Sequence, residues 1–380
     1  MKVLVVRETR VNERRVAATP ETVKKLVSLG CTVAVEAGAG AAANITDDSY
    51  REAGADVVSD ISSTSDADVL LKVQRPGEGR DESSSLKPGG LLIGMLAPTA
   101  DEDQIKGYAD RGIVAISLEL LPRITRAQSM DVLSSQSNLA GYKAVLDAAS
   151  VYGRAMPMMM TAAGTVAPAK VFVLGAGVAG LQAIATARRL GAIVSATDVR
   201  PVAKEQVESL GAKFVMVESP EAENAETAGG YAREMSADYQ QRQQALVRST
   251  LEKSDIAICT ALIPGRRAPT LINADTVRSM KPGSVIVDLA VEQGGNCELS
   301  VPGEVADVNG VMIVGYFNVP SRLATDASAL YAKNLFNFLS PLIDAESKSL
   351  KIDWEDEILK ATVLTRDGQV VLPKSEGKAS

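Results

Sequence analysis

The stretch Ala169–Arg200, AKVFVLGAGVAGLQAIATARRLGAIVSATDVR, decides the fold of this chain. An apolar strand, KVFVL, leads directly into Gly175, Gly177 and Gly180, which have GxGxxG spacing and are followed by a helical segment. The first glycine of this pattern allows a tight turn, the second lets a pyrophosphate approach the backbone, and the third lets the helix pack closely on the strand. Because the N-terminus of the helix then faces the phosphates, the pattern predicts a dinucleotide-binding turn.

Asp198 ends the next apolar strand, IVSATD, at the distance expected for an acidic residue that binds a ribose. A carboxylate there can accept hydrogen bonds from the adenosine ribose and would repel a 2′-phosphate, so Asp198 favours NAD over NADP. Arg200 lies two residues further on and could hold such a phosphate, which leaves NADP as an alternative.

Apolar strands alternate with helical segments along most of the chain, which predicts mostly parallel, doubly wound sheets. The fold class we expect is α/β, with two doubly wound parallel-sheet (Rossmann-like) domains and a cleft between them. Residues 1–135, completed by 320–380, would form the N-terminal domain, and residues 136–319 would form the NAD(H)-binding domain. The patterns at Leu139–Tyr152 and Ala329–Ile343 predict helices, and the second helix would return to the N-terminal domain.

Composition excludes several classes of protein. The formal net charge of −7 argues against non-specific nucleic-acid binding. Three scattered cysteines, Cys31, Cys259 and Cys297, fit a reduced cytosolic protein better than a disulfide framework. No apolar stretch approaches the roughly 20 residues that span a bilayer, so we expect a soluble chain. The chain has no histidine, and therefore lacks the commonest metal ligand and the commonest general acid/base; we expect no metal.

A polar segment, Arg123–Asn138, precedes the glycine-rich stretch and offers Arg123, Arg126, Gln128 and Asp131. An amide beside an aspartate can hold the carboxamide of nicotinamide, and an arginine can neutralise a pyrophosphate or a carboxylate. A hydride that passes between two nicotinamides needs no proton transfer, so these orienting groups would suffice in a dry site. The alternative is that the segment only caps the next helix through Ser129 or Asp131.

Long motifs add a specific resemblance, from the first residues to beyond Asn334. They are ETRVNERRVAATPETV, LKVQRP, PRITRAQSMDVLSSQSNLAGY, VLGAGVAGLQAIATARRLGA, TAGGYAREM, ALIPGRRAP, MKPGSVIVDLA, GGNC and NVPSRL. The chain resembles the proton-translocating NAD(P) transhydrogenase family, specifically the soluble NAD(H)-binding alpha subunit (domain I) of the split bacterial form. The resemblance implies hydride transfer from NADH bound here to NADP⁺ on a partner, coupled to proton translocation by membrane-spanning subunits. It also implies a homodimer that is cytoplasmic and peripheral on the inner membrane.

The resemblance also implies site residues. The family's nicotinamide loop corresponds to Arg123, Ile124, Thr125, Arg126, Gln128, Asp131 and Ser134, with Gln128, Asp131, Arg123 and Ser134 as the catalytic set. The glycine turn with Val178, and then Asp198, Val199 and Arg200, would hold the adenosine side, and Leu262 would line the same cleft. Gly230 and Tyr231 match a mobile loop that closes over the nucleotide, within the polar excursion from Glu218 to Gln244.

Alanine dehydrogenase, a close relative of that family, is the alternative. The resemblance implies that Arg15 and Lys72 correspond to residues that hold a keto acid there. The histidine that performs acid/base work in alanine dehydrogenase is replaced here by Met95. We therefore expect no direct catalytic use of Arg15 or Lys72. A third hypothesis, a module that senses or buffers NAD(H), predicts binding without hydride transfer.

Overall fold

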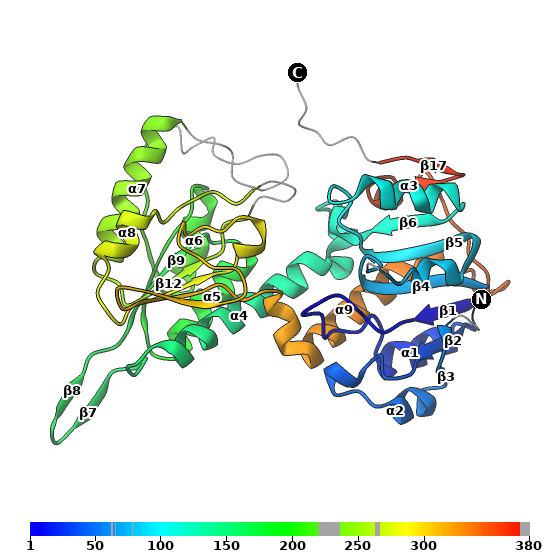
Figure 1. Ribbon diagram of the computed structural model, residues 1–380, viewed down its shortest axis with the longest axis horizontal. Helices are drawn as coiled ribbons and strands as arrows, with labels where there is room; N and C mark the ends of the chain where they lie inside the picture. Colours follow the sequence, from blue (N-terminus) through cyan, green and yellow to red (C-terminus); the bar gives the residue numbers. More distant parts are fainter. Residues whose placement is uncertain are drawn as a thin grey trace. The chain divides into compact units, whose positions relative to one another are not determined.

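The computed structural model describes residues 1–61, 64, 66–77, 79–217, 219, 236–262 and 267–372 (Figure 1). The chain divides into two compact units. Unit 1 contains Met1–Gln136 and Ser321–Ser380, and unit 2 contains Ser137–Pro320. Each unit is built around its own sheet, in which most strand pairs are parallel.

The sheet of unit 1 has six strands in the order β3-β2-β1-β4-β5-β6, and all neighbours are parallel. The strands are β1 (Lys2–Val5), β2 (Thr32–Glu36), β3 (Asp56–Val58), β4 (Ala67–Gln74), β5 (Leu86–Met95) and β6 (Val114–Ser117). The order reverses between β1 and β4, as in a doubly wound sheet.

Helices cover both faces of this sheet because its strands are apolar on both sides. One face carries α1 (Pro20–Ser28), α2 (Asp47–Glu52) and α9 (Ala324–Leu339), and the other carries α3 (Glu102–Asp110). The remaining pieces are α10 (Glu357–Thr362), the hairpin β16 (Thr365–Arg366) and β17 (Gln369–Val370), and the 3₁₀ turns η1 (Ala41–Ala43), η3 (Glu82–Ser85), η4 (Leu118–Leu120), η5 (Thr125–Met130), η8 (Val319–Leu323) and η9 (Ser340–Leu342).

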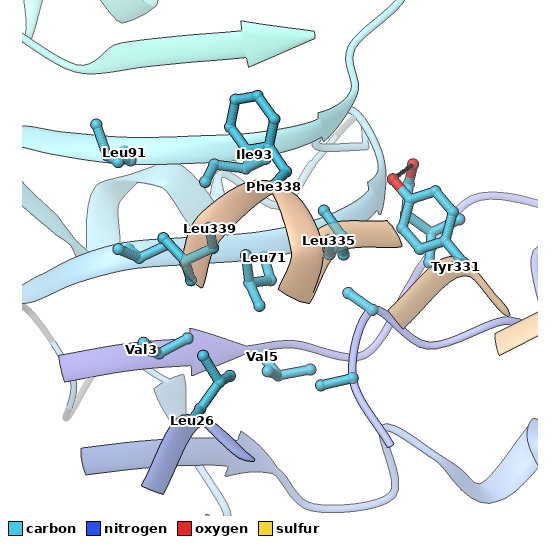
Figure 2. Close-up of a cluster of buried hydrophobic side chains, with 14 of the residues drawn as sticks. Val3, Val5, Leu26, Leu71, Leu91, Ile93, Tyr331, Leu335, Phe338 and Leu339 are labelled. Carbon is cyan, nitrogen blue, oxygen red and sulfur yellow. Dashed lines mark hydrogen bonds between the residues drawn. The ribbon is translucent and has the colours of Figure 1, made fainter. Parts of the chain in front are cut away.

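Helix α9 supplies much of the core of unit 1. Leu335, Phe338 and Leu339 lie over the sheet face formed by β1, β4 and β5, and all three side chains are buried (Figure 2). The hydroxyl of Tyr331 donates to the carbonyl oxygens of Lys72 and Val73 at 2.9 and 3.1 Å. The helix begins at Ala324, earlier than the sequence pattern predicted.

The sheet of unit 2 has seven strands in the order β11-β10-β9-β12-β13-β15-β14. Its strands are β9 (Lys170–Leu174), β10 (Ile193–Thr197), β11 (Lys213–Phe214), β12 (Ile256–Cys259), β13 (Val285–Asp288), β14 (Val305–Val308) and β15 (Val311–Val314). All pairs are parallel except the edge pair of β14 with β15. Two doubly wound sheets confirm the predicted α/β fold class.

Both faces of this second sheet are also covered by helices. α4 (Val132–Val151), α5 (Val178–Arg189) and α6 (Val202–Ser209) pack on one face, and α7 (Ala237–Leu251) and α8 (Ala274–Ser279) pack on the other. The 3₁₀ turn η7 (Val291–Gln293) follows β13. Helix α4 begins at Val132, not near Leu139 as predicted, because Asp131 caps it inside the polar segment.

A hairpin of β7 (Met159–Thr161) and β8 (Gly164–Val166) follows α4 and was not predicted. Its side chains are largely exposed, including Met159 and Met160. Across the residues that the structure describes, no helix combines the length and the apolar character that crossing a membrane requires.

Candidate functional site

The three glycines of the strand–turn–helix in unit 2 have different surroundings. Gly175 has φ +101°, and a side chain there would lie 2.7 Å from the hydroxyl of Thr260. A Cβ on Gly180 would lie 1.9 Å from the carbonyl oxygen of Gly175. A Cβ on Gly177 would meet no described atom within 4 Å. Gly175 and Gly180 therefore serve the fold, whereas the space at Gly177 is open to a ligand.

Gly177 is also the N-cap of α5, so the unpaired backbone N–H groups of the first helical turn point to the same open space. Val178, the first residue of the helix, is partly exposed there. Such a helix end attracts negative charge. The donor set and the absence of a side chain at Gly177 fit a pyrophosphate.

Asp198 lies just beyond β10, beside the glycine turn. Its Oδ2 accepts from the N–H of Ala176 at 2.8 Å, which ties the carboxylate to the turn. Arg200 donates to Asp198 through Nε and Nη2, both at 2.9 Å, and the two side chains form a two-point ion pair. In the sequence, Asp198 favoured NAD whereas Arg200 left NADP as an alternative. The ion pair turns the arginine toward the carboxylate, while Val199 between them is only partly buried.

Two residues that sequence reasoning missed shape the neighbouring strand ends. The hydroxyl of Thr260, after β12, donates to the carbonyl oxygen of Gly175 at 2.9 Å. Asn296 is fully buried, accepts from the N–H of Ala261 and donates to the carbonyls of Ala261 and Pro269. These bonds fix the chain next to Leu262, whose side chain is 38% exposed. No local pattern signals either role, although Asn296 falls in the quoted GGNC motif.

These residues converge where β9, β10 and β12 end. The strand order reverses between β9 and β12, and in open α/β sheets ligands bind at this switch point, outside the carboxyl ends of the strands. The structure thus brings together Gly175, Gly177, Gly180 and the Asp198–Arg200 pair within unit 2.

The polar segment of unit 1 forms the 3₁₀ turn η5 and then the start of α4. Asp131 accepts from the N–H of Ser134 at 2.9 Å and from its hydroxyl at 2.5 Å. Asp131 therefore caps α4, as one part of the alternative hypothesis held, while the claim that the segment does nothing more stays a prediction. The Ser129 side chain has no such bond among those described. The Asp131 carboxylate can still accept hydrogen bonds from a ligand while it caps the helix, because each oxygen can accept more than one.

Gln128 is exposed, and its side-chain amide has no hydrogen-bond partner within the described residues. Ile124 packs against the core of unit 1, and Thr125 starts the turn. The carbonyl oxygen of Ser129 accepts from the amides of Asn334 and Asn337 of α9, both at 2.9 Å. Helix α9 therefore holds the turn that presents Gln128, a role that sequence reasoning did not find.

The arginines of the segment are not equivalent. Arg126 makes a two-point pair with Asp356 at 2.7 and 2.8 Å and is 54% exposed. The hydrogen bond from Arg126 holds the pKa of Asp356 below its usual range. Arg123 is exposed and also has an interaction within the structure. Gly230 and Tyr231, together with most of the predicted closing loop, lie outside the described residues.

Arg15 and Lys72 are buried and paired with carboxylates of their own chain. Arg15 donates to both oxygens of Glu13, at 2.8 and 2.6 Å. Lys72 lies 3.0 Å from Glu82 and 3.4 Å from Glu8. Burial raises the pKa of Glu8 to about 7, partly offset by the charge of Lys72. The two cations are therefore neutralised internally.

Comparison with known proteins places these features in a family. The family models described as "Alanine dehydrogenase/PNT, N-terminal domain" and "Alanine dehydrogenase/PNT, C-terminal domain" match residues 4–140 and 144–373. The first section of the NAD(P) transhydrogenase alpha subunit of Rhodospirillum rubrum is 55% identical, over 100% of both chains. The corresponding protein of Rickettsia prowazekii is 45% identical, over 98% of this chain and 96% of that one.

Solved structures agree. A transhydrogenase structure from Sinorhizobium meliloti has 54% identity and a TM-score of 0.88, covering 98% of this chain and 100% of that chain. An L-alanine dehydrogenase structure matches with a TM-score of 0.83 but only 27% identity, over 98% of this chain and 97% of the other. The chain therefore belongs to the alanine dehydrogenase/PNT family of oxidoreductases, and within it is similar to the NAD(P) transhydrogenase alpha subunits at much higher identity than to the alanine dehydrogenases.

Proposed function

We propose that this chain binds NAD(H) and presents its nicotinamide to NADP⁺ bound on a partner subunit, for direct hydride transfer. The observation that carries the proposal is the open position at Gly177, at a helix N-terminus, in a chain without any histidine. The first feature fits a pyrophosphate, and the second removes the usual proton donor of a dehydrogenase.

The adenosine side of NAD(H) would be held in unit 2. The pyrophosphate would accept hydrogen bonds from the first turn of α5, with Gly175, Val178 and Gly180 shaping the turn. Asp198 accepts four hydrogen bonds, from the backbone N–H groups of Ala176 and Arg200 and from Nε and Nη2 of Arg200, which fill the roughly four lone-pair sites of a carboxylate. A ribose hydroxyl would therefore replace one of the two guanidinium bonds, and the other would keep Arg200 on the carboxylate. Because the Arg200 guanidinium is turned toward Asp198, it is not presented to a 2′-phosphate, which supports NAD(H) over NADP(H). Val199 and Leu262 would provide apolar contacts.

The nicotinamide side would be held by η5 and the start of α4. Gln128 offers a carboxamide donor and acceptor that can match those of nicotinamide. The hydrogen bonds between Asp131 and Ser134 fix the backbone that follows it in the chain. Arg123 would neutralise phosphate charge, with Ile124, Thr125 and Arg126 alongside. When bound, NADH supplies the hydride. The residues of the chain orient it and need to move no proton, so catalysis rests on positioning.

The partners follow from the same proposal. The relatives are named subunits of NAD(P) transhydrogenase, so a second component is needed. We place NADP(H) on that component and proton translocation in membrane-spanning subunits, with this chain peripheral on the cytoplasmic side of the inner membrane. A homodimer is supported by the apolar hairpin, where Met158, Met159 and Met160 are exposed. Gly230 and Tyr231 would close over the nucleotide.

Rapid mixing tests the proposal directly. The NADH-loaded chain is mixed with an isolated NADP⁺-loaded partner subunit, and NADPH formation is followed, with a control lacking the partner. A burst that requires the partner is the expected result. NADH oxidation by pyruvate and ammonia without any partner would instead identify an alanine-dehydrogenase-like enzyme. Tight NADH binding with neither activity would identify a sensing module.

Substitution of Gln128 tests how the site works. Gln128→Ala should lower the burst rate by about 100-fold, the cost of a misplaced reactant, while NADH affinity falls only modestly. Gln206→Ala, at an exposed glutamine of α6, is the matched control and should change neither quantity. An unchanged burst in Gln128→Ala would show that η5 does not aim the nicotinamide.

A further inference from the structure

The chain passes between the two units twice. The first crossing follows Gln136, in the first turns of α4, and the second precedes Ser321, just before α9. Both residues are polar, and both are buried, at 5% and 0% exposure. Buried polar side chains at two such positions call for an explanation, because an apolar residue would pack there without needing a partner.

One ion pair provides that explanation. Arg15 and Glu13 form a two-point pair in the segment between β1 and α1, with both side chains almost completely buried. The backbone N–H of Arg15 also donates to Glu13, at 2.9 Å. Such a fork holds both side chains in a single geometry. The pair is therefore a rigid point within unit 1.

The residues at both crossings, Gln136 and Ser321, are hydrogen-bonded to the Glu13–Arg15 pair. Nη1 of Arg15 donates to Oε1 of Gln136 at 2.9 Å. The hydroxyl of Ser321 donates to Glu13 at 3.1 Å and accepts from the N–H of Arg14 at 2.7 Å. The Gln136 amide in turn donates to the carbonyl of Ala327 in α9, at 3.2 Å. The side chains of Glu13, Arg15, Gln136 and Ser321 together form a clamp.

We propose that the clamp is a positioning device that fixes the directions in which both connections leave unit 1, and so restricts how far unit 2 can reorient. Two flexible connections would permit many orientations, whereas two connections bonded to one buried charge pair behave as a single hinge. The clamp would affect hydride transfer only if the proposed function holds, since the polar segment and the glycine turn belong to different units. The restriction of motion itself does not depend on the proposed function.

Spin-label distances test the restriction. Glu52→Cys in α2 and Glu205→Cys in α6 are exposed positions, one in each unit, and the three native cysteines are buried and so poorly labelled. The variants are Gln136→Leu and the milder Ser321→Ala. The matched control is Gln74→Leu, because Gln74 also donates to Glu13, at 2.7 Å, but lies at the end of β4 and not at a crossing.

Gln136→Leu and Ser321→Ala should broaden the distance distribution, and Gln74→Leu should not. With the partner subunit, the first two should slow hydride transfer by about tenfold while NADH affinity stays within about twofold, as expected when reactants are misaligned without loss of binding. Unchanged distributions in both crossing variants, or equal broadening in Gln74→Leu, would overturn the proposal. Selective broadening in a chain that transfers no hydride even when unmodified would support the clamp and refute the proposed function.

Discussion

Replacing Gly177 with alanine should change nucleotide affinity without lowering the stability of the fold. Gly177 has φ −78°, a value that alanine adopts freely, and its Cβ would meet no described atom within 4 Å. Gly→Ala changes at such positions stabilise by about 0.4–1 kcal/mol, because the unfolded chain loses conformational freedom. The free energy of unfolding of Gly177→Ala should therefore be unchanged or slightly higher.

NADH binding should respond in the opposite direction. The added methyl group occupies the space where a pyrophosphate would approach the N-terminus of α5 most closely. We expect affinity to fall by at least tenfold, which corresponds to about 1.4 kcal/mol of binding free energy. Fluorescence titration with NADH measures the affinity, and thermal unfolding without nucleotide measures the stability.

Gly180→Ala is the contrasting variant three residues away. Its Cβ would lie 1.9 Å from the carbonyl oxygen of Gly175, and neither the strand end nor the helix can yield without a backbone shift. Overpacking of this kind costs about 1–3 kcal/mol or more. This variant should lose stability, and affinity with it. A Gly177→Ala protein that binds NADH as tightly as the unmodified chain would refute the assignment of this turn to the pyrophosphate.

Three further predictions concern unit 1. Burial raises the pKa of Glu8 from 4.5 to about 7, so the folded state retains a proton that the unfolded chain releases. The free energy of unfolding should therefore fall by up to about 3 kcal/mol as the pH rises from about 4.5 to about 7. Urea unfolding midpoints at pH 5 and pH 8 should show that Glu8→Gln loses less stability over this change than the unmodified chain. An identical loss in the two proteins would contradict the raised pKa of Glu8. Ser134→Ala removes a donor to the Asp131 cap and should cost about 1 kcal/mol by thermal unfolding, whereas no change would mean that water replaces the bond. Arg126→Ala breaks an exposed ion pair and should cost less than about 1 kcal/mol, and the effect should shrink in high salt.

The main strands of each sheet could be predicted from the sequence because apolar strands and glycine turns are local signals. β9, the glycine turn and α5 follow from contiguous residues, and so does Asp198 at the end of β10. The sequence pattern placed the start of α4 near Leu139 and left a cap at Asp131 as an alternative, because Asp131 and Ser134 resemble any polar loop until the helix is seen. The β7–β8 hairpin was missed because its methionines remain exposed and show no burial pattern.

The supporting residues of the site could not be predicted, since their partners are distant in sequence. Asn334 reaches Ser129 across 205 positions, and Ser321 reaches Glu13 across 308. A single asparagine in a helix, or a serine before one, carries no pattern that distinguishes it from a surface residue. Only the packing of α9 against unit 1 gives these side chains their roles.

The buried cations of unit 1, Arg15 and Lys72, are each paired with carboxylates of the same chain. A keto-acid dehydrogenase needs an unpaired cation for the substrate carboxylate and a group that delivers a proton. Arg15 is engaged by Glu13 and Gln136, and Lys72 lies between Glu8 and Glu82. Displacing Glu13 would leave the buried charge of Arg15 without its carboxylate partner, which costs several kcal/mol. The pairing leaves neither cation available to a substrate carboxylate, which fits the proposed transfer of a hydride alone, and the two cations instead hold parts of unit 1 together.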